Sequence, residues 1–177
     1  MAPPKRLRIL SLDGGGFRGL SSLIMLQTVF NTFKANLEPE QPDLKPCDFF
    51  DLIAGTSTGG IIALMLGRLR MSIEDCIQVY SRLGEKVFGQ QQSPPHRERF
   101  DAQKLEDAIQ EIVEAHTGQR NAPLLDPLEG RCCKTAVFTI SGNAVAHSEP
   151  EVLRTYRVKG IATDDSQQPW MIWESAR

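Results

Sequence analysis

Short apolar runs alternate with amphipathic stretches along this chain of 177 residues. The first run, residues 7–12, ends abruptly at three consecutive glycines, which predicts a short strand followed by a loop. Apolar residues then recur about every 3.6 positions up to Pro39, which predicts a helix over residues 19–37. Its recurring positions are Leu20, Leu23, Ile24, Val29, Phe30, Phe33 and Leu37.

A second apolar run, residues 49–54, predicts a buried strand. The glycine-rich segment GTSTGG, residues 55–60, follows it at once. Residues 61–66 (IIALML) are apolar all round, as expected for a helix buried against a sheet. The pattern therefore predicts a strand, a sharp turn and a buried helix with no spacer between them.

The middle of the chain predicts two amphipathic helices. The first begins at Ser72, whose spacing to Asp75 is close to that of a capping box. The second begins at Asp101, a good N-cap residue, and closes at Gly118. The polar and proline-rich residues 89–99 between the two helices predict a loop.

The last third of the chain predicts two strands, a strong one over residues 135–140 and a weaker one over residues 152–158. Pro169 suits the first turn of a helix at the end of the sequence. Because strands alternate with helices, and the early strands are apolar on both faces, the pattern predicts an α/β fold with a largely parallel sheet. We expect one domain over residues 7–177, preceded by a short lead of residues 1–6.

The composition is that of a globular chain, and the small net charge reduces the classes of partner that need to be considered. Hydrophobic residues make up 41% of the sequence and charged residues 24%, which argues against disorder. The net charge of −2 gives no general attraction to nucleic acid. The chain does not open on a signal-peptide pattern, and its four cysteines include no Cys-x-x-Cys pair. We therefore expect a cytoplasmic protein with reduced thiols and no metal, and contact with a membrane surface stays open.

Two glycine-rich loops carry the candidate chemistry. The first, residues 14–19 (GGGFRG), fits the G-x-G-x-x-G fingerprint of dinucleotide sites, which is weak on its own. Such a site also needs an acidic residue at the end of a second strand about 20 residues later, and no predicted strand precedes Glu38 or Glu40. A phosphate-binding P-loop fails because no Gly-Lys-Ser/Thr follows.

The second loop reads G-x-S-x-G from Gly55 to Gly59, between the predicted strand and the buried helix. A serine on such a turn is forced out above the sheet, and its neighbours must be small so that they do not clash with a substrate. The positive end of the helix also favours developing negative charge there. An ordinary glycine–serine turn is the simpler alternative, and this loop alone leaves both open.

Taken as a pair, the two loops are complementary. Acyl transfer at a serine needs backbone N–H donors that are aimed at the oxyanion. Three glycines at the end of a neighbouring strand can present consecutive, unhindered N–H groups. The pair therefore favours Ser57 as a nucleophile and residues 14–16 as the segment that receives the negative charge.

At this point the sequence resembles a known family. Residues 13–19 (DGGGFRG) and 51–60 (DLIAGTSTGG) are closely similar to the motifs of the patatin-like phospholipases, the calcium-independent phospholipase A2 group. Residues 172–177 (IWESAR) also resemble the start of that family's Trp-x-x-x-Arg-Ala-Thr-Ser helix. The resemblance covers essentially the whole chain. It implies a three-layer α/β/α fold with a largely parallel central sheet, which we expect to be incomplete at the C-terminus.

The resemblance also implies roles for individual residues. Ser57 is then the nucleophile of a Ser–Asp dyad, and Asp13 is structural. The residues that it places around the oxyanion are Gly14, Gly15, Gly16 and Arg18. The residues that it places on the nucleophile elbow are Gly55, Thr56, Thr58 and Gly59. No metal or other cofactor is implied, because N–H groups hold the oxyanion.

The dyad aspartate is the missing part. In the family it lies in an Asp-Gly-Gly/Ala motif downstream of the Trp-x-x-x-Arg helix, and the sequence stops at Arg177 before such a motif. None of the other aspartates is a convincing substitute: Asp43, Asp48, Asp51, Asp75, Asp101, Asp107, Asp126, Asp164 and Asp165. His96 fits a surface loop and His116 a helix end, which leaves His147 as the least unsuitable histidine base.

The leading hypothesis is a serine lipid acyl hydrolase, a phospholipase A-type enzyme that acts on phospholipid or another acyl lipid through an acyl-serine intermediate. A serine without a base is a poor nucleophile, so we expect this chain alone to be inactive. The missing aspartate favours an alternative, a non-catalytic regulatory or interaction module that keeps the fold. Nucleotide binding ranks third. Fusion to further C-terminal domains in the full-length protein stays open.

Overall fold

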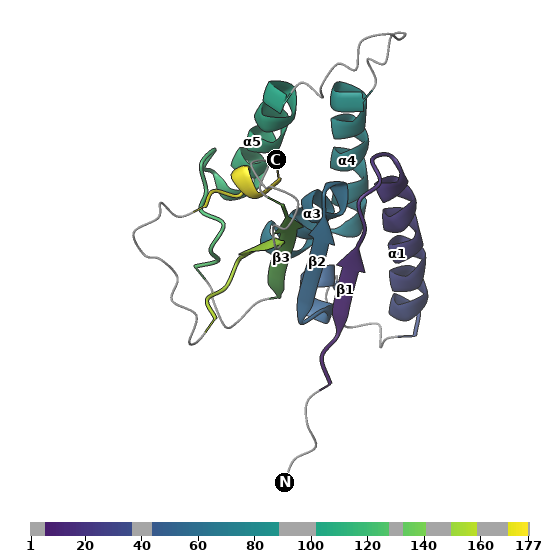
Figure 1. Ribbon diagram of the computed structural model, residues 1–177. Helices are drawn as coiled ribbons and strands as arrows, with labels where there is room; N and C mark the ends of the chain where they lie inside the picture. The colour runs from purple at the N-terminus through teal and green to yellow at the C-terminus, as the bar shows by residue number, and fades with distance from the viewer. Residues whose placement is uncertain are drawn as a thin grey trace.

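The computed structural model describes residues 6–36, 44–88, 102–127, 133–140, 150–158 and 170–176. Within these residues four strands form one sheet in the order β1-β2-β3-β4. β1 (Ile9–Leu12), β2 (Leu52–Thr56) and β3 (Lys134–Thr139) run parallel, and β4 (Glu151–Arg154) joins β3 in the antiparallel direction (Figure 1). The predicted α/β class with a largely parallel sheet is therefore confirmed.

The parallel pairing fixes where the two glycine-rich loops leave the sheet. Leu12, the last residue of β1, pairs with Gly55 of β2, and Gly55 in turn pairs with Val137 of β3. The carboxyl ends of the three strands consequently lie along the same edge. The loop after β1 and the turn after β2 are therefore neighbours, although about 40 residues separate them in the sequence.

The helix that follows β2 lies directly against the sheet. α3 (Thr58–Ala63) is buried along its whole length and continues as the π-helical segment η1 (Leu64–Arg68). It contacts β1, β2 and β3, which agrees with the buried helix predicted from the apolar run IIALML. Gly67 allows η1 to approach β3 closely, because a Cβ at this position would collide with the Thr135 hydroxyl.

Three longer helices complete the core. α1 (Arg18–Lys34) packs against α4 (Ile73–Phe88), which packs against α5 (Ala102–Thr117) (Figure 1). The buried residues of α1 are Gly19, Leu23, Leu26 and Phe30, a spacing of three or four residues. Ile24 and Val29, which the pattern predicted for the core face, are exposed because they lie off this stripe.

The start of α4 and the end of α5 agree with the sequence. The Asp75 amide donates to Ser72 Oγ at 3.0 Å, which is the predicted N-terminal cap of α4. Gly118 follows α5 with a φ of 73°, the left-handed conformation expected after a helix C-terminus. The predicted loop over residues 89–99 and the predicted cap at Asp101 lie outside the described residues.

The strand predicted over residues 49–54 begins three residues too early. Pro46–Phe49 instead forms the short helix α2, and the Lys45 amide donates to Asp48 Oδ2 at 3.1 Å at its start. Phe49 then packs edge-on against Phe30 of α1, with ring centroids 5.7 Å apart. The apolar run is thus divided between a helical turn that covers α1 and the strand β2.

The helix predicted from Pro169 onward is wrong for the described residues 170–176. Met171 forms an antiparallel bridge with Pro123, and only Glu174–Ala176 forms a short 3₁₀ helix, η2. The apolar residues after Pro169 were compatible with a helix. The bridge was not predicted because the partner of Met171 lies about 50 residues earlier in the sequence and leaves no local signal. β4 is also shorter than the strand predicted over residues 152–158.

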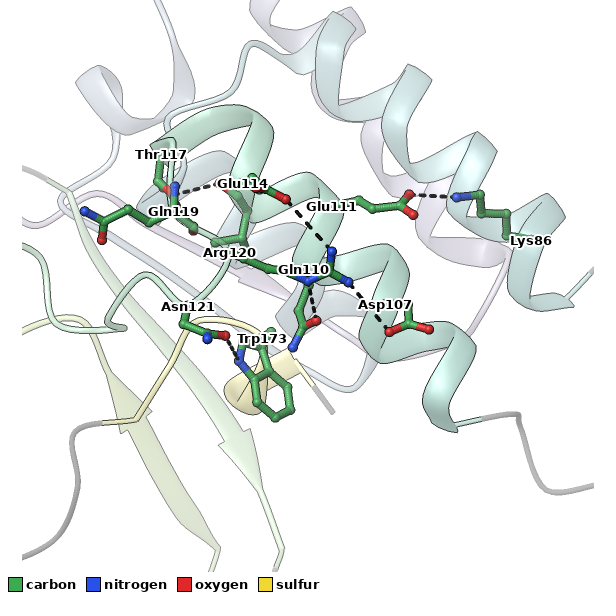
Figure 2. Close-up of polar contacts among 11 residues, drawn as sticks. Lys86, Asp107, Gln110, Glu111, Glu114, Thr117, Gln119, Arg120, Asn121 and Trp173 are labelled. Carbon is green, nitrogen blue, oxygen red and sulfur yellow. Dashed lines mark hydrogen bonds and ion pairs between the residues drawn. The ribbon is translucent and has the colours of Figure 1, made fainter.

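Polar contacts fix this C-terminal segment beside α5, as Figure 2 shows. Arg120, just after α5, donates from Nε to Gln110 Oε1 at 2.8 Å and lies 3.7 Å from Asp107 Oδ1. The next residue, Asn121, accepts a hydrogen bond of 3.2 Å from the indole of Trp173. The segment after α5 is thereby held both to its own helix and to the end of the described chain.

No helix in the described part of the chain combines the length and the apolar character that crossing a membrane requires.

Candidate active site

Ser57 occupies the sharp turn between β2 and α3. Its backbone angles, φ 51° and ψ −129°, lie in a region that residues with a side chain rarely adopt. Ser57 is exposed, whereas the three residues that follow it are buried. The turn therefore projects one hydroxyl group from the carboxyl edge of the sheet.

The glycines on either side of Ser57 are explained by close backbone contacts. A Cβ on Gly55 would collide with the carbonyl group of Gly59, and a Cβ on Gly59 would collide with the carbonyl oxygen of Leu12. These obstacles are backbone atoms, which cannot rotate away as the end of a long side chain can. The G-x-S-x-G spacing is therefore what lets α3 start directly on top of β2 and β1.

The triglycine loop, residues 14–16, lies against the elbow. An ideal Cβ built on Gly14 would be 2.9 Å from Ser57 Cβ and 3.5 Å from Ser57 Oγ. Gly14 thus leaves open the space beside the serine that any larger residue would fill. The two loops are in contact at one edge of the sheet.

All three amides of the triglycine loop point toward threonine hydroxyls that flank the serine. The Gly14 amide donates to Thr56 Oγ1 at 3.3 Å. The Gly15 and Gly16 amides both donate to Thr58 Oγ1 at 3.1 Å. Thr58 is buried and Thr56 is exposed, so the acceptor of Gly14 is the one that can turn toward solvent.

Arg18 begins α1 directly beside this loop. Its amide donates to the Gly15 carbonyl at 3.2 Å, and a Cβ on Gly15 would lie 3.3 Å from Arg18 Nε. Gly16 between them has a φ of 56°, so the chain turns into the helix through a left-handed residue that favours glycine. Arg18 therefore contacts the loop through both its backbone and its side chain.

A pocket of about 590 Å³ opens next to Ser57. One part of its wall is the carboxyl end of β3, with Val137 and Phe138, and the next residue, Ile140. Its lining residues are Thr56, Ser57, Val137, Phe138, Thr139, Ile140, Pro150, Ser175 and Ala176. The lining is mainly apolar and holds no ionisable side chain among the described residues, so it suits a hydrocarbon chain better than a charged ligand.

A family model for patatin-like phospholipases matches residues 10–167, most of the chain. This chain belongs to the patatin-like phospholipase family. The matched span includes both glycine-rich loops, β2, β3, β4 and all of β1 except its first residue, Ile9. The family resemblance inferred from the two motifs is thereby confirmed.

Named relatives cover the chain only in part. Phospholipase A I of Arabidopsis thaliana is 40% identical over 89 residues, which are 50% of this chain and 6% of that protein. Human calcium-independent phospholipase A2-gamma is 40% identical over 84 residues, 48% of this chain and 10% of that protein. Patatin-like protein 1 of Oryza sativa subsp. indica is 33% identical over 126 residues, 63% of this chain and 30% of that protein. The chain therefore spans at most about a third of the length of these relatives.

Asp13 directly precedes the triglycine loop, and the other described aspartates of this patatin-like chain are engaged elsewhere. Asp126 pairs with Arg70 at 3.2 Å, and Asp51 accepts a hydrogen bond of 2.9 Å from the Arg8 amide. Asp48 lies at the start of α2, Asp75 at the start of α4, and Asp107 beside Arg120. His116 contacts the Ile112 carbonyl oxygen through Nδ1 at 2.9 Å, at the end of α5. His96, His147, Asp43, Asp101, Asp164 and Asp165 lie outside the described residues.

The sequence did not single out Tyr80, which also contacts the triglycine loop. Tyr80 lies on α4, and its hydroxyl donates to the Gly16 carbonyl oxygen at 2.7 Å. In the sequence Tyr80 is one more apolar position on the buried face of a helix, so no local signal separates it from the core. Its contact with the loop appears only when α1 and α4 pack together.

In the described part of the chain, no three or more His, Cys, Asp or Glu residues are placed so that they could hold a metal ion.

Proposed function

We propose that this chain carries the nucleophile and the oxyanion donors of a serine lipid acyl hydrolase of the phospholipase A type. The observation that carries the proposal is the contact between Gly14 and Ser57, on a strained turn that opens into an apolar pocket. Ser57 Oγ attacks the ester carbonyl carbon, and its proton passes to a general base. The base then protonates the departing alcohol oxygen, here a lysophospholipid, and water hydrolyses the acyl-Ser57 intermediate by the same route in reverse.

The oxyanion is the second part of the proposal. We assign it first to the Gly14 amide, whose hydrogen bond to Thr56 is long and exposed and can be exchanged for one to substrate. The amide of Thr58, the residue after the nucleophile and the first residue of α3, is the natural second donor, because amides of a first helical turn have no acceptor within the helix. Gly15 and Gly16 complete this loop, and Arg18 contacts it from the start of α1.

The general base is the third part. The described residues that line the pocket of Ser57 include no carboxylate or imidazole. We therefore propose that the aspartate of a Ser–Asp dyad, which the family resemblance implies, comes from sequence outside the described residues. Ser57 should then be nearly unreactive when the described part of the chain is separated from that aspartate.

The substrate class follows from the pocket and from the names of the relatives. A mainly apolar pocket beside the nucleophile fits a fatty acyl chain, and two of the relatives carry phospholipase A names. We propose phospholipid, approached at a membrane surface, as the substrate. Metal is not needed in this scheme because amide groups stabilise the oxyanion.

The test uses the full-length protein and phosphatidylcholine vesicles that contain EDTA, with released fatty acid measured by mass spectrometry. Wild-type protein should release fatty acid and lysophospholipid, and Ser57→Ala should reduce the release to background. Ser81→Ala is the matched control, because Ser81 donates to the Ile77 carbonyl oxygen within α4 and is not among the described residues that line the pocket. Release that is equal in wild-type protein and Ser57→Ala would refute the proposal.

One observation favours a second function. The absence of an ionisable side chain from the described lining of the pocket also fits a non-catalytic module that binds an acyl chain without cleaving it. Such a module would bind lipid vesicles equally well as wild-type protein and as Ser57→Ala, with no fatty acid released from either. The same vesicle experiment therefore separates the two functions.

A further inference from the structure

The triglycine loop needs support from outside itself. Glycine has the widest backbone freedom of any residue, so three in a row do not fix the direction of their own amides. Donors that stabilise an oxyanion are effective only when they are held in place before the reaction. The contacts of Gly15 and Gly16 show which groups supply this constraint.

Thr58 and Tyr80 form a hydrogen-bonded network beneath the loop. Thr58 Oγ1 accepts from the Gly15 and Gly16 amides at 3.1 Å, and Tyr80 Oη donates to the Gly16 carbonyl oxygen at 2.7 Å. Thr58 also acts on the Tyr80 hydroxyl, whose pKa it lowers in part against the larger effect of burial. The backbone amide of Gly16 is therefore bonded to Thr58, the first residue of α3, and its carbonyl oxygen is bonded to Tyr80 of α4.

Tyr80 is suited to this contact by its surroundings. Its side chain is only 3% exposed, and burial raises the pKa of its hydroxyl above the ordinary value. The hydroxyl consequently keeps its proton at neutral pH and acts as a permanent donor. A buried donor that is paired in this way is also costly to leave without its acceptor, which favours a single position of the loop.

Gly19 makes room for the tyrosine. A Cβ on Gly19 would collide with Tyr80 Oη and would lie 2.9 Å from Ile62 Cδ1. This is the last glycine of G-x-G-x-x-G, the position that a dinucleotide site uses for close packing of its helix. In this chain the same glycine is explained by the tyrosine hydroxyl that reaches past it to Gly16.

We propose that Tyr80 is a positioning residue, which acts through Gly16 and Thr58 to hold the triglycine loop in the orientation that the reaction at Ser57 requires. The inference rests on the proposed hydrolase function. By holding the amides of Gly15 and Gly16 inward on Thr58, the network leaves the Gly14 amide at the side of Ser57. Tyr80 is not among the described residues that line the pocket of Ser57, and its hydroxyl donates to the Gly16 carbonyl oxygen.

Tyr80→Phe tests this role, because it removes one oxygen atom and keeps the ring. In the full-length protein we expect kcat to fall about tenfold while KM changes less than about twofold, since the loop acts on the transition state more than on bound substrate. Tyr156→Phe is the matched control, since it removes the same atom from a tyrosine near β4, whose ring contacts the Lys134 ammonium group. Both variants are measured well below their melting temperatures. An unchanged kcat in Tyr80→Phe, or a rise in KM alone, would overturn the inference.

Gly19→Ala provides a second, independent test. In the wild-type background its methyl group should displace the Tyr80 hydroxyl and lower kcat. In the Tyr80→Phe background the same substitution should cost less, because the shortest contact, with the hydroxyl, is gone and only the contacts of 2.9 Å with the ring Cζ and with Ile62 Cδ1 remain. If the loss of kcat in the double variant equals the combined losses of the two single variants, the proposed network is contradicted. Failure of the hydrolase function is distinct, because wild-type protein would then show no turnover that depends on Ser57, and the role of Tyr80 would fall with it.

Discussion

Gly14 and Ser57 touch across the carboxyl edge of the sheet, with only 2.9 Å between Ser57 Cβ and the place where a Cβ of residue 14 would lie. This contact joins two segments that are individually ambiguous, a glycine-rich turn after β1 and a serine turn after β2. It depends on the parallel register of the two strands, in which Leu12 lies opposite Gly55. The proposed function rests on this contact between Gly14 and Ser57 more than on either motif alone.

Gly14→Ala should therefore inactivate the enzyme while the fold survives. The added methyl group lies 3.5 Å from Ser57 Oγ and 3.2 Å from the Thr56 carbonyl oxygen, so it narrows the space for the oxyanion and pushes on the elbow. We expect kcat for phospholipid hydrolysis to fall about 100-fold or more, the size seen when one oxyanion donor is lost. Gly118→Ala, on the surface after α5, is the control for a general effect of replacing glycine. Wild-type activity in Gly14→Ala would contradict the assigned geometry.

The strain at Ser57 predicts an inverted order of stability. At most positions alanine is more favourable than glycine, but at φ 51° and ψ −129° the Cβ atom is the source of the strain. Ser57→Gly should therefore exceed Ser57→Ala in free energy of unfolding by about 1 kcal/mol, measured by urea denaturation. Ser81 within α4 supplies the comparison, since Ser81→Gly should be less stable than Ser81→Ala by about the same amount. If Ser57→Ala had the higher free energy of unfolding than Ser57→Gly, the backbone at residue 57 would not be strained.

The apolar wall of the pocket predicts a dependence on acyl chain length. Phe138 is 41% exposed and lines the pocket beside Ser57. In Phe138→Ala the KM for a long-chain ester should rise roughly tenfold, with little change for a butyryl ester that does not reach the ring. Phe33→Ala is the control, because Phe33 is similarly exposed but lies on α1. Equal effects on short and long esters would show that the acyl chain binds elsewhere.

Buried thiols predict a loss of stability at alkaline pH. Burial, and secondarily the Asp75 carboxylate, raises the pKa of Cys76 well above its ordinary value of 9.0. The unfolded chain then loses this proton as the pH rises through about 9, whereas the folded chain keeps it. The free energy of unfolding should thus be insensitive to this thiol at pH 7 and should decline above about pH 9, by up to about 1.4 kcal/mol per pH unit.

Urea denaturation between pH 7 and pH 10 under reducing conditions checks this expectation. Cys76→Ala should lose its part of the decline, whatever its stability at pH 7. Cys47→Ala is a useful companion, because burial raises the pKa of Cys47 to about 11 and its contribution should be limited to the range between about pH 9 and pH 11. A decline in Cys76→Ala as steep as that of the wild-type protein would assign the effect to other groups.

The sequence predicted those features that have a local cause. The triglycine segment and the G-x-S-x-G segment predicted turns because glycine adopts backbone conformations that other residues avoid, as Gly16 does, and the apolar run after Ser57 predicted the buried α3. Ser72 marked the start of α4 through a hydrogen bond three residues away. The order of elements then sufficed to predict a largely parallel sheet.

The sequence failed where the cause lies far along the chain. The bridge between Met171 and Pro123 replaced a predicted helix, because strand-like pairing depends on a partner that local periodicity does not reveal. Pro46 starts a helical turn that extends to Phe49, the first residue of the predicted strand. At the site, Tyr80 was indistinguishable from a core residue until α4 packed beside the loop that it contacts.

The central claim is that Ser57 is the reactive nucleophile, and covalent labelling tests it most directly. Full-length protein is treated with a fluorophosphonate probe, and the modified residue is located by mass spectrometry of peptides. We predict a single adduct on Ser57, retained in Ser81→Ala and absent from Ser57→Ala. An adduct on another residue, or labelling that persists undiminished in Ser57→Ala, would contradict the account.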